Sequence, residues 1–299
     1  MLQQVEEYLH IIPDGVYCDC TAGAGGYAEM ILGRLDKGRL VMIDRDREAL
    51  DACRERFGEF GERVTFYHGS CGEIGEAVKD SAPLAGIVAD LGLSSLQLDD
   101  PERGFSFRSG GPLDMRMDRT RDLRAEQIVN YYDEIQIANL IYQHGGERRS
   151  RQIARAIVRE RPVKDTRHLA EIVARAVSRP KHQKMHPATK TFQALRITVN
   201  DELGELQTLL AAAPSLLAAN GRFVAVSFHS GEDRLVKQAF RDDGKSGVYE
   251  ILTKSVVRPS DREVYDNPPS RSAKLRAVRR TDREYGCGEK ESLVTQWSS

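Results

Sequence analysis

Short apolar segments alternate with helical patterns over the first hundred residues. The apolar segments are residues 15–20, 39–44, 64–67 and 84–90, and helical patterns cover 27–35 and the residues leading to Phe57. Strands that are apolar along their whole length and alternate with helices indicate a parallel sheet covered on both faces. This pattern therefore predicts an α/β fold built on a doubly wound, mostly parallel sheet.

A long interval interrupts this alternation. The next strand pattern is 222–228, introduced by an expected turn at Asn220-Gly221, and further strands are expected at 249–253 and 275–278. Helical periodicity recurs over 125–177, and one long helix is expected over 189–217. Because a single crossover needs far fewer residues, we expect an inserted all-helical domain at 101–187. The core domain would then comprise 1–100 and 188–299.

A glycine-rich loop follows the first strand, and it has three interpretations. Gly23, Gly25 and Ala28 fit the pattern G-x-G-x-x-G/A, which is typical of dinucleotide sites but is weak alone. The loop could also be a turn that only packs a helix onto a strand. Asp19 favours a third ligand, S-adenosylmethionine, because a carboxylate there would attract the methionine ammonium group and repel a pyrophosphate.

Residues after the next three strands complete the predicted donor site. Asp44 ends the second strand, 19 residues beyond Gly25, where it can accept hydrogen bonds from ribose hydroxyls; the alternative is a helix cap. Cys71, after the third strand, lies where adenine is expected. Residues 90–99 follow the fourth strand and should face the methyl donor, unless they form an ordinary surface loop.

Charge is distributed unevenly along the chain. Residues 141–190 contain 13 Lys and Arg against 4 Asp and Glu, although the whole chain has a net charge of −1. Such a segment is expected to face a polyanion. The candidate contacts to RNA phosphates are Arg148, Arg149, Arg151, Arg155, Arg159 and Lys190. The alternative is a solvated helix face whose arginines pair with Glu147 and Glu160.

Cysteine usage and apolar content indicate the compartment. Five cysteines without a C-x-x-C pair favour a reducing environment, and no apolar run approaches the ~18 residues of a membrane span. The N-terminal residues do not resemble a signal peptide, so we expect a cytoplasmic protein. No grouping of His, Cys and Asp has metal-ligand spacing, so we expect no metal.

Five segments together resemble the small-subunit ribosomal RNA methyltransferase H (MraW) family. They are DLGLSSLQL at 90–98, ERGFSF at 102–107, GPLDMRMD at 111–118, HPATKTFQALRI at 186–197 and SFHS at 227–230, the last followed by Glu232-Asp233-Arg234. The resemblance covers nearly the whole chain. Three positions depart from the pattern, since Tyr27 stands where His is usual, Cys71 where a bulkier residue is frequent and Gly231 where Leu is usual. Members also carry a short His-containing segment before the first helix, so we expect the native start to lie upstream of Met1.

The resemblance implies a reaction and its partners. It implies N4-methylation of a cytidine in the decoding region of 16S ribosomal RNA. Whether the substrate is naked RNA or the assembled small ribosomal subunit stays open, as does the choice between a monomer and a homodimer. S-adenosylmethionine would be the donor and S-adenosylhomocysteine the product, bound by a class I, Rossmann-like methyltransferase core that an inserted helical substrate domain interrupts. The implied donor contacts are Gly25, Gly26, Tyr27, Asp44, Cys71, Asp90 and Gln97, which add to Asp19 and Gly23.

Methyl transfer to an exocyclic amine needs a positioned acceptor for the amine hydrogens. Asp90 is the first candidate; Asp114 is the second, with a structural ion pair to Arg116 or Arg119 as its alternative. Phe105, Phe107 and Phe228 could stack on an extruded base or belong to the core, and His186 and His229 could be functional or structural. Residues 267–270, NPPS, resemble an amino-methyltransferase motif but follow no fourth strand, so we expect a turn or an RNA-facing loop. Two other functions stay open, a nicotinamide-dependent oxidoreductase and a non-catalytic RNA-binding protein.

Overall fold

The computed structural model describes residues 1–108, 110–177 and 185–283, which divide into two compact units. Unit 1 comprises Met1–Asp44, Leu50–Leu91 and the described chain from Leu206 onward. Unit 2 comprises Arg45–Ala49 and Gly92–Glu205. Unit 2 therefore starts before residue 101 and ends after residue 187, the bounds expected for the inserted domain.

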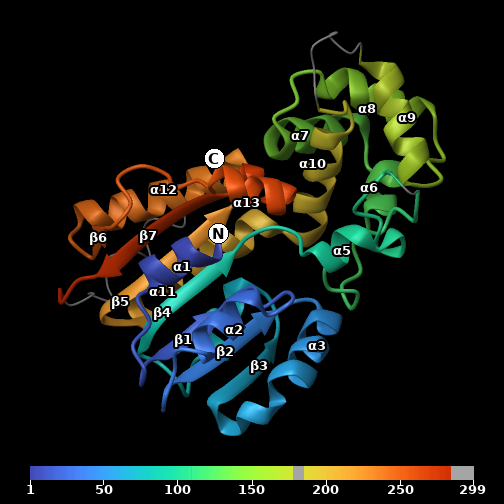
Figure 1. Ribbon diagram of the computed structural model, residues 1–299. Helices are drawn as coiled ribbons and strands as arrows, with labels where there is room; N and C mark the ends of the chain where they lie inside the picture. The colour runs from blue at the N-terminus through green and yellow to red at the C-terminus, as the bar shows by residue number, and fades with distance from the viewer. Residues whose placement is uncertain (109, 178–184, 284–299) are drawn as a thin grey trace. The chain divides into compact units, whose positions relative to one another are not determined.

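Unit 1 is built on a seven-stranded sheet of order β3-β2-β1-β4-β5-β7-β6 (Figure 1). The strands are β1 (Val16–Asp19), β2 (Arg39–Asp44), β3 (Val64–His68), β4 (Leu84–Asp90), β5 (Leu217–Ser227), β6 (Tyr249–Ile251) and β7 (Lys274–Arg280). All neighbours are parallel except β7, which is antiparallel to both β5 and β6. The predicted doubly wound, Rossmann-like sheet is confirmed. The strand order reverses between β1 and β4, the point at which such sheets bind ligands.

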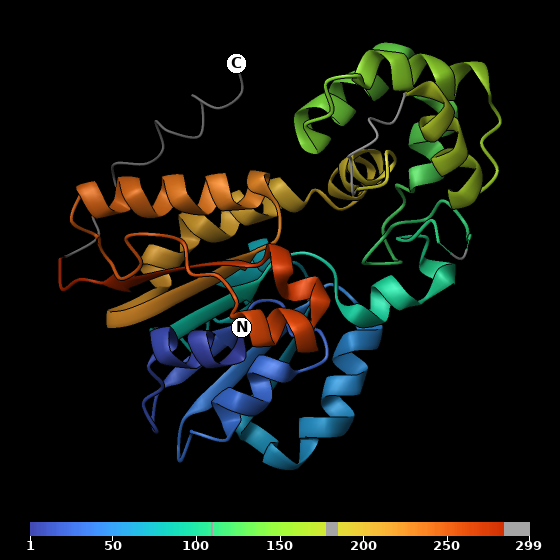
Figure 2. The same cartoon turned by 45° about the horizontal axis from the view of Figure 1, so that its top comes forward.

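Both faces of this sheet are buried, as the apolar strands predict. Along β2, Val41 and Ile43 belong to one hydrophobic cluster, whereas Leu40 and Met42 belong to the other. The helices of this part of the chain are α1 (Leu2–Leu9), α2 (Gly26–Leu32), α3 (Arg47–Phe57), α4 (Ile74–Ala77), α11 (Glu202–Leu216), α12 (Ser230–Lys245) and α13 (Asp261–Asp266). In the second view α12 and α11 run together along one side of the sheet, and α1 and α2 lie on the other (Figure 2). None of the described helices is long and apolar enough to cross a membrane.

In its described residues, unit 2 contains helices but no strand, and residues 104–124 are irregular apart from the undescribed residue 109. Its helices are α5 (Ser95–Asp99), α6 (Ala125–Tyr131), α7 (Glu134–Gly145), α8 (Ser150–Arg159), α9 (Thr166–Ala176) and α10 (Thr189–Asn200). Asp133 and Asp165 cap α7 and α9 by accepting backbone N–H bonds from Gln136 and His168. The apolar faces of α6, α7, α8, α9 and α10 share one core, so unit 2 has a hydrophobic core of its own.

Two sequence expectations about local structure are wrong. The helix expected over 189–217 is two helices, because Asp201 adopts a left-handed conformation (φ 49°) that ends α10 before α11 begins. The turn expected at Asn220-Gly221 lies inside β5, where Asn220 has φ 65° and the register with β4 shifts. Asn and Asp tolerate this conformation better than most residues, so each break is local.

Asn200, the last residue of α10, fastens the irregular segment before α6 to that helix. Its side-chain oxygen accepts the Met117 N–H at 2.7 Å, and its amide group donates to the Met115 carbonyl at 2.7 Å. The residue is buried, so these backbone groups depend on Asn200 rather than on water.

We expect Asn200→Ala to destabilise the protein by about 2–4 kcal/mol, because it leaves the Met117 N–H and the Met115 carbonyl buried and unsatisfied. The measurement is urea unfolding followed by far-UV circular dichroism. The matched control is Asn139→Ala, at an exposed position of α7, which should change the free energy of unfolding by less than about 0.5 kcal/mol. Equal effects of the two substitutions would contradict the role given to Asn200.

Candidate functional site

The loop between β1 and α2 is shaped by glycines. Gly23 and Gly25 have positive φ angles of 49° and 79°, and the Gly25 N–H donates to the Ala22 carbonyl at 2.7 Å. A Cβ atom on Gly25 would lie 2.5 Å from the Phe57 ring, so a side chain does not fit. A Cβ atom on Gly26, the first residue of α2, would meet nothing within 4 Å. The loop thus presents bare backbone beside open space.

Three carboxylates end the three strands around the switch point. They are Asp19 on β1, Asp44 on β2 and Asp90 on β4. The Asp44 Oδ2 atom accepts the Gly23 N–H at 2.8 Å, which ties the glycine loop to β2. The cap at the start of α3 is made by Asp46, whose carboxylate accepts the Glu48 N–H at 3.1 Å. The helix cap that was the alternative interpretation of Asp44 is therefore made by Asp46.

Thr21 links two of these strand ends. Its hydroxyl oxygen accepts the Asp90 N–H at 2.7 Å, and its own N–H donates to Asp19 Oδ1 at 3.1 Å. Sequence reasoning did not single out Thr21. The available signal was its position between Asp19 and the first glycine of the loop.

Asp19 and Asp90 keep acceptor atoms buried without a partner. Asp19 Oδ2 and Asp90 Oδ1 are inaccessible and make no hydrogen bond to the described chain. Burial raises the pKa of both carboxyls to about 7. Asp90 and Asp44 raise the pKa of Asp19 further, while the Thr21 N–H opposes the shift. A site with surplus buried acceptors is complementary to a cationic group.

Tyr27 lies in α2, directly after the glycine loop, and Cys71 follows β3. The Tyr27 hydroxyl bonds to the Asp90 carboxylate, and burial together with that carboxylate raises the Tyr27 pKa well above its usual range. Tyr27 is therefore a neutral hydrogen-bond donor. Cys71 is buried at the start of a short 3-10 helix after β3, and Ser70 and Glu73 form a capping box there.

Two predicted site residues lie in unit 2, where each has a protein partner. The Gln97 side chain donates to Asp46 Oδ2 at 2.8 Å and accepts the Ser94 N–H at 3.2 Å. Asp114 forms a two-pronged ion pair with Arg116, at 2.7 and 2.8 Å. Burial alone would raise the pKa of Asp114, but the hydrogen bonds from Arg116 outweigh it and hold that pKa low. Asp114 therefore forms the structural ion pair with Arg116 that was the alternative to a catalytic role.

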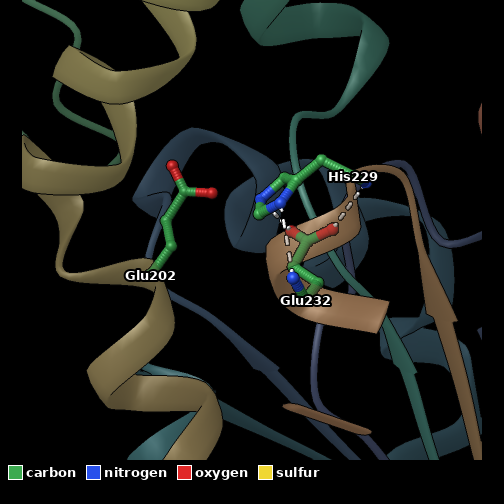
Figure 3. Close-up of side chains that lie close together, drawn as sticks. All are labelled: Glu202, His229 and Glu232. Atoms are coloured by element: carbon green, nitrogen blue, oxygen red, sulfur yellow. Dashed lines mark hydrogen bonds and ion pairs between the residues drawn. The ribbon is translucent and has the colours of Figure 1, made fainter. Parts of the chain in front are cut away.

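His229 and Glu232 form a local cap at the start of α12 (Figure 3). His229 Nδ1 accepts the Gly231 and Glu232 N–H groups, and Glu232 Oε2 accepts those of Phe228 and His229. The imidazole Nε2 atom lies 3.2 Å from Glu232 Oε1. Glu202, also drawn there, belongs to unit 2 and pairs with Arg196 at 2.7 Å. These contacts give His229 a structural role.

The aromatic candidates take part in packing. Phe105 is buried in the core of unit 2, and Phe107 packs against Phe192 and the His186 ring at centroid distances of 5.0 and 4.6 Å. Phe228 is partly buried against one face of the sheet. The NPPS segment is a short 3-10 helix after α13. Packing in the core, rather than stacking on a base, therefore accounts for Phe105 and Phe107.

The basic side chains of unit 2 fall into two groups. Arg155 pairs with Glu134 at 3.5 Å, Arg159 with Glu160 at 3.5 Å, and Lys190 with Glu147 at 3.8 Å. Arg148, Arg149 and Arg151 are exposed on α8 and the turn before it. Among them, Arg148 and Arg151 have no ion pair with any described residue. These two are the strongest candidates for binding an external anion.

Comparison with known proteins gives matches along nearly the whole chain. The model of the MraW methylase family matches residues 1–281. A ribosomal RNA small subunit methyltransferase H from Solibacter usitatus is 50% identical over 274 residues, 91% of this chain and 95% of that protein. Proteins of the same name from Koribacter versatilis and Acidobacterium capsulatum are 48% and 46% identical. Those alignments cover 93% of this chain in both cases, and 92% and 96% of the relatives.

Asp19→Asn should stabilise the protein in a pH-dependent way. The unfolded carboxyl has its ordinary pKa near 4, whereas the folded carboxyl has a pKa of about 7. Between these values the folded state holds a proton that the unfolded state has released, so the parent loses stability as pH rises from about 4 to 7. Asn has no charge to bury. The gain over the parent should therefore grow by the order of 2 kcal/mol between pH 5 and pH 8.

Urea unfolding of parent and variant at both pH values measures this difference. The control is Asp36→Asn, on the exposed turn before β2, whose effect should be the same at pH 5 and pH 8. A pH-independent effect of Asp19→Asn would show that the Asp19 carboxyl is not titrating near neutrality.

Proposed function

This chain belongs to the MraW methylase family, and from that premise we propose that it transfers a methyl group from S-adenosylmethionine to N4 of a cytidine in the decoding region of 16S ribosomal RNA. The relatives named ribosomal RNA small subunit methyltransferase H support the RNA substrate. The small ribosomal subunit would be the larger partner, and the enzyme would work in the cytoplasm.

The observation that carries the proposal is the pair of buried, unsatisfied carboxylate oxygens of Asp19 and Asp90 beside the glycine loop. S-adenosylmethionine carries a positive ammonium and a positive sulfonium, which suit such a site. A dinucleotide pyrophosphate would add negative charge to buried carboxylates, at a high electrostatic cost. The residues present therefore fit the methyl donor and disfavour a nicotinamide cofactor.

We assign the donor-binding residues as follows. Asp19 would face the methionine ammonium group, Asp44 the ribose hydroxyls and Cys71 the adenine. The backbone of Gly23, Gly25 and Gly26 would admit the donor closely, and Tyr27 would hold Asp90 in place by its hydrogen bond. When bound, the donor supplies an electrophilic methyl group on a positively charged sulfur. Gln97 would act indirectly, since its amide is already engaged by Asp46 and Ser94.

We assign to Asp90 the binding of the exocyclic amine of the target cytosine. The lone pair of a cytosine amine is delocalised into the ring, and a carboxylate that accepts an N–H bond favours the geometry in which nitrogen can attack. As the N–C bond forms, the C–S bond breaks and its electron pair stays on sulfur. The proton lost from nitrogen passes to Asp90, whose pKa of about 7 suits this transfer at neutral pH. Asp114 is the weaker candidate because Arg116 already engages both of its oxygens.

Nucleoside analysis after reaction with isotopically labelled S-adenosylmethionine tests the proposal directly. We expect label in N4-methylcytidine when small subunits or decoding-region RNA are supplied. Asp90→Asn should lower kcat on the order of 10²-fold or more, because it removes the proton acceptor. The parent's kcat should rise as pH increases through about 7, where the Asp90 carboxyl ionises.

Thermal unfolding provides the ligand control. S-adenosylhomocysteine at 100 times its Kd should stabilise the protein by about 2.7 kcal/mol, whereas NAD should not. A labelled methyl group on any other atom of the RNA would contradict the proposal that N4 of cytidine is the target. Ligand binding without transfer to any RNA would favour a non-catalytic RNA-binding protein.

The exposed arginines of unit 2 give a prediction about RNA affinity. Arg148→Gln with Arg151→Gln should lower the slope of log affinity against log salt by about 1.4–1.8, since each phosphate contact contributes about 0.7–0.9. The control pair is Arg155→Gln with Arg159→Gln, whose parent side chains already pair with acidic neighbours and should matter less. If the double variant of Arg148 and Arg151 keeps the parent's slope of log affinity against log salt, α8 does not contact the RNA.

A further inference from the structure

Unit 1 contains a cavity at the end of the sheet opposite β3. It has a volume of about 140 Å³ and lies between α12 and the edge strand β6. Its lining includes two apolar side chains, Phe240 and Ile251, which are called here its apolar floor, together with Thr253 and the cations Lys237, Arg241, Lys254 and Arg276. In Figure 1, α12 lies alongside β6 and β7 at the end of the sheet opposite β3. None of these side chains has a part in the proposed methyl transfer.

The positive charge around this cavity is largely unneutralised. Arg276 pairs with Asp233 at 2.8 Å. Lys237, Arg241 and Lys254 are exposed, and in the described part of the chain they form no ion pair. Lys237 and Arg241 are also four residues apart on α12, an arrangement of like charges that weakens a helix. Three such cations at one opening favour an anionic ligand.

The apolar floor indicates that the ligand of this cavity also carries an apolar, flat group. Phe240 packs at a steep angle against Phe223 and Tyr249, at centroid distances of 5.3 and 6.0 Å, and this packing fixes its ring. Ile251 is an apolar side chain that remains 39% exposed. A free phosphate would satisfy the cations but not this floor. A nucleotide satisfies both, because its base packs on apolar surfaces while its phosphates meet Lys and Arg.

The position of the cavity relates it to the proposed target base. Strand β6 runs parallel to β4, because β5 pairs in parallel with β4 while β7 is antiparallel to both β5 and β6. Lys254 follows the end of β6, so it lies toward the edge of the sheet at which Asp90 ends β4. Three strand spacings, or roughly 15 Å, separate β4 from β6 across the sheet. The register places Ile251 level with Ile87, three residues or roughly 10 Å along β4 before Asp90. An RNA strand bound at Asp90 spans these distances within a few nucleotides.

We propose that this cavity binds a nucleotide of the RNA substrate that flanks the target cytidine, with the base on Phe240 and Ile251 and the adjoining phosphates at Lys237, Arg241 and Lys254. The inference rests on the proposed function, since it takes RNA as the substrate. It adds a second RNA contact, on the domain that carries the glycine loop.

The test compares two matched pairs of substitutions in the full chain. Lys237→Gln with Arg241→Gln removes two cations of the cavity. Lys37→Gln with Arg39→Gln removes an exposed Lys and Arg at the opposite edge of the sheet, where β2 begins. For single-stranded RNA the cavity pair should lower the salt slope by about 1.4 and weaken binding about 25-fold at 0.1 M salt, converging on the parent near 1 M. The control pair should match the parent.

A third variant, Ile251→Glu, tests the floor of the cavity. It places a negative charge at an exposed position, so the fold should persist, and we expect weaker RNA binding with an unchanged response to S-adenosylhomocysteine. Far-UV circular dichroism and Tm establish that each variant is folded. Inorganic phosphate, tested alone by thermal shift, should give no stabilisation that depends on Lys237 and Arg241, because it has no group that packs on the apolar floor.

The outcomes separate this inference from the proposed function. If the parent methylates RNA and the cavity variants bind RNA with the parent's slope, the inference is wrong and the proposed function stands. If cavity variants bind RNA normally but lose activity only on assembled subunits, the cavity meets a protein partner and the inference is also overturned. Stabilisation by inorganic phosphate alone, lost in the Lys237 and Arg241 variant, would make the cavity a site for a free anion and would overturn the inference. Failure of the parent to methylate any RNA would overturn the proposed function itself.

Discussion

The hydrogen bond from the Gly23 N–H to the Asp44 carboxylate holds together the region on which the proposed chemistry depends. It fixes the glycine loop to the end of β2, while Thr21 fixes the same loop to the end of β4 through the Asp90 N–H. Three strand ends are thereby connected by two short polar contacts. Asp19 ends β1 directly before this loop and accepts the Thr21 N–H, and its carboxylate is buried although burial opposes its charge. The electrostatic character of the site is a consequence of this connection.

The sheet could be predicted from the sequence because its signals are local. Apolar strands such as β2 and β4 have no polar face, and Asp19, Asp44 and Asp90 follow their strands directly. Parallel pairing then brings all three carboxylates to one edge of the sheet. The break at Asp201 could not be predicted in this way, because both flanking segments are good helices and the left-handed conformation belongs to a single residue.

Side-chain partners were harder to predict than side-chain positions. Gln97 was expected near the donor, but its amide binds Asp46, a residue 51 positions earlier in the chain. Asp114 had two interpretations that only the distance to Arg116 could separate. The arginines of α8 share one sequence pattern, yet Arg155 has an acidic neighbour on α7 and Arg151 does not among the described residues. Such differences depend on packing between helices, which the pattern of one helix does not contain.

The interruption between β4 and β5 has a consequence for synthesis of the protein. These two strands pair along most of their length, yet about 125 residues lie between Asp90 and Leu217. At a translation rate of roughly 5–20 residues per second, β4 emerges roughly 6–25 s before its partner. During that interval β4 is an edge strand with apolar side chains, and its unpaired N–H and C=O groups can pair with other chains. The helices of unit 2, whose core is separate, can pack during the same interval and shorten the effective distance that β5 must close. Nascent chains halted within unit 2 should therefore be the form of this protein most prone to aggregation.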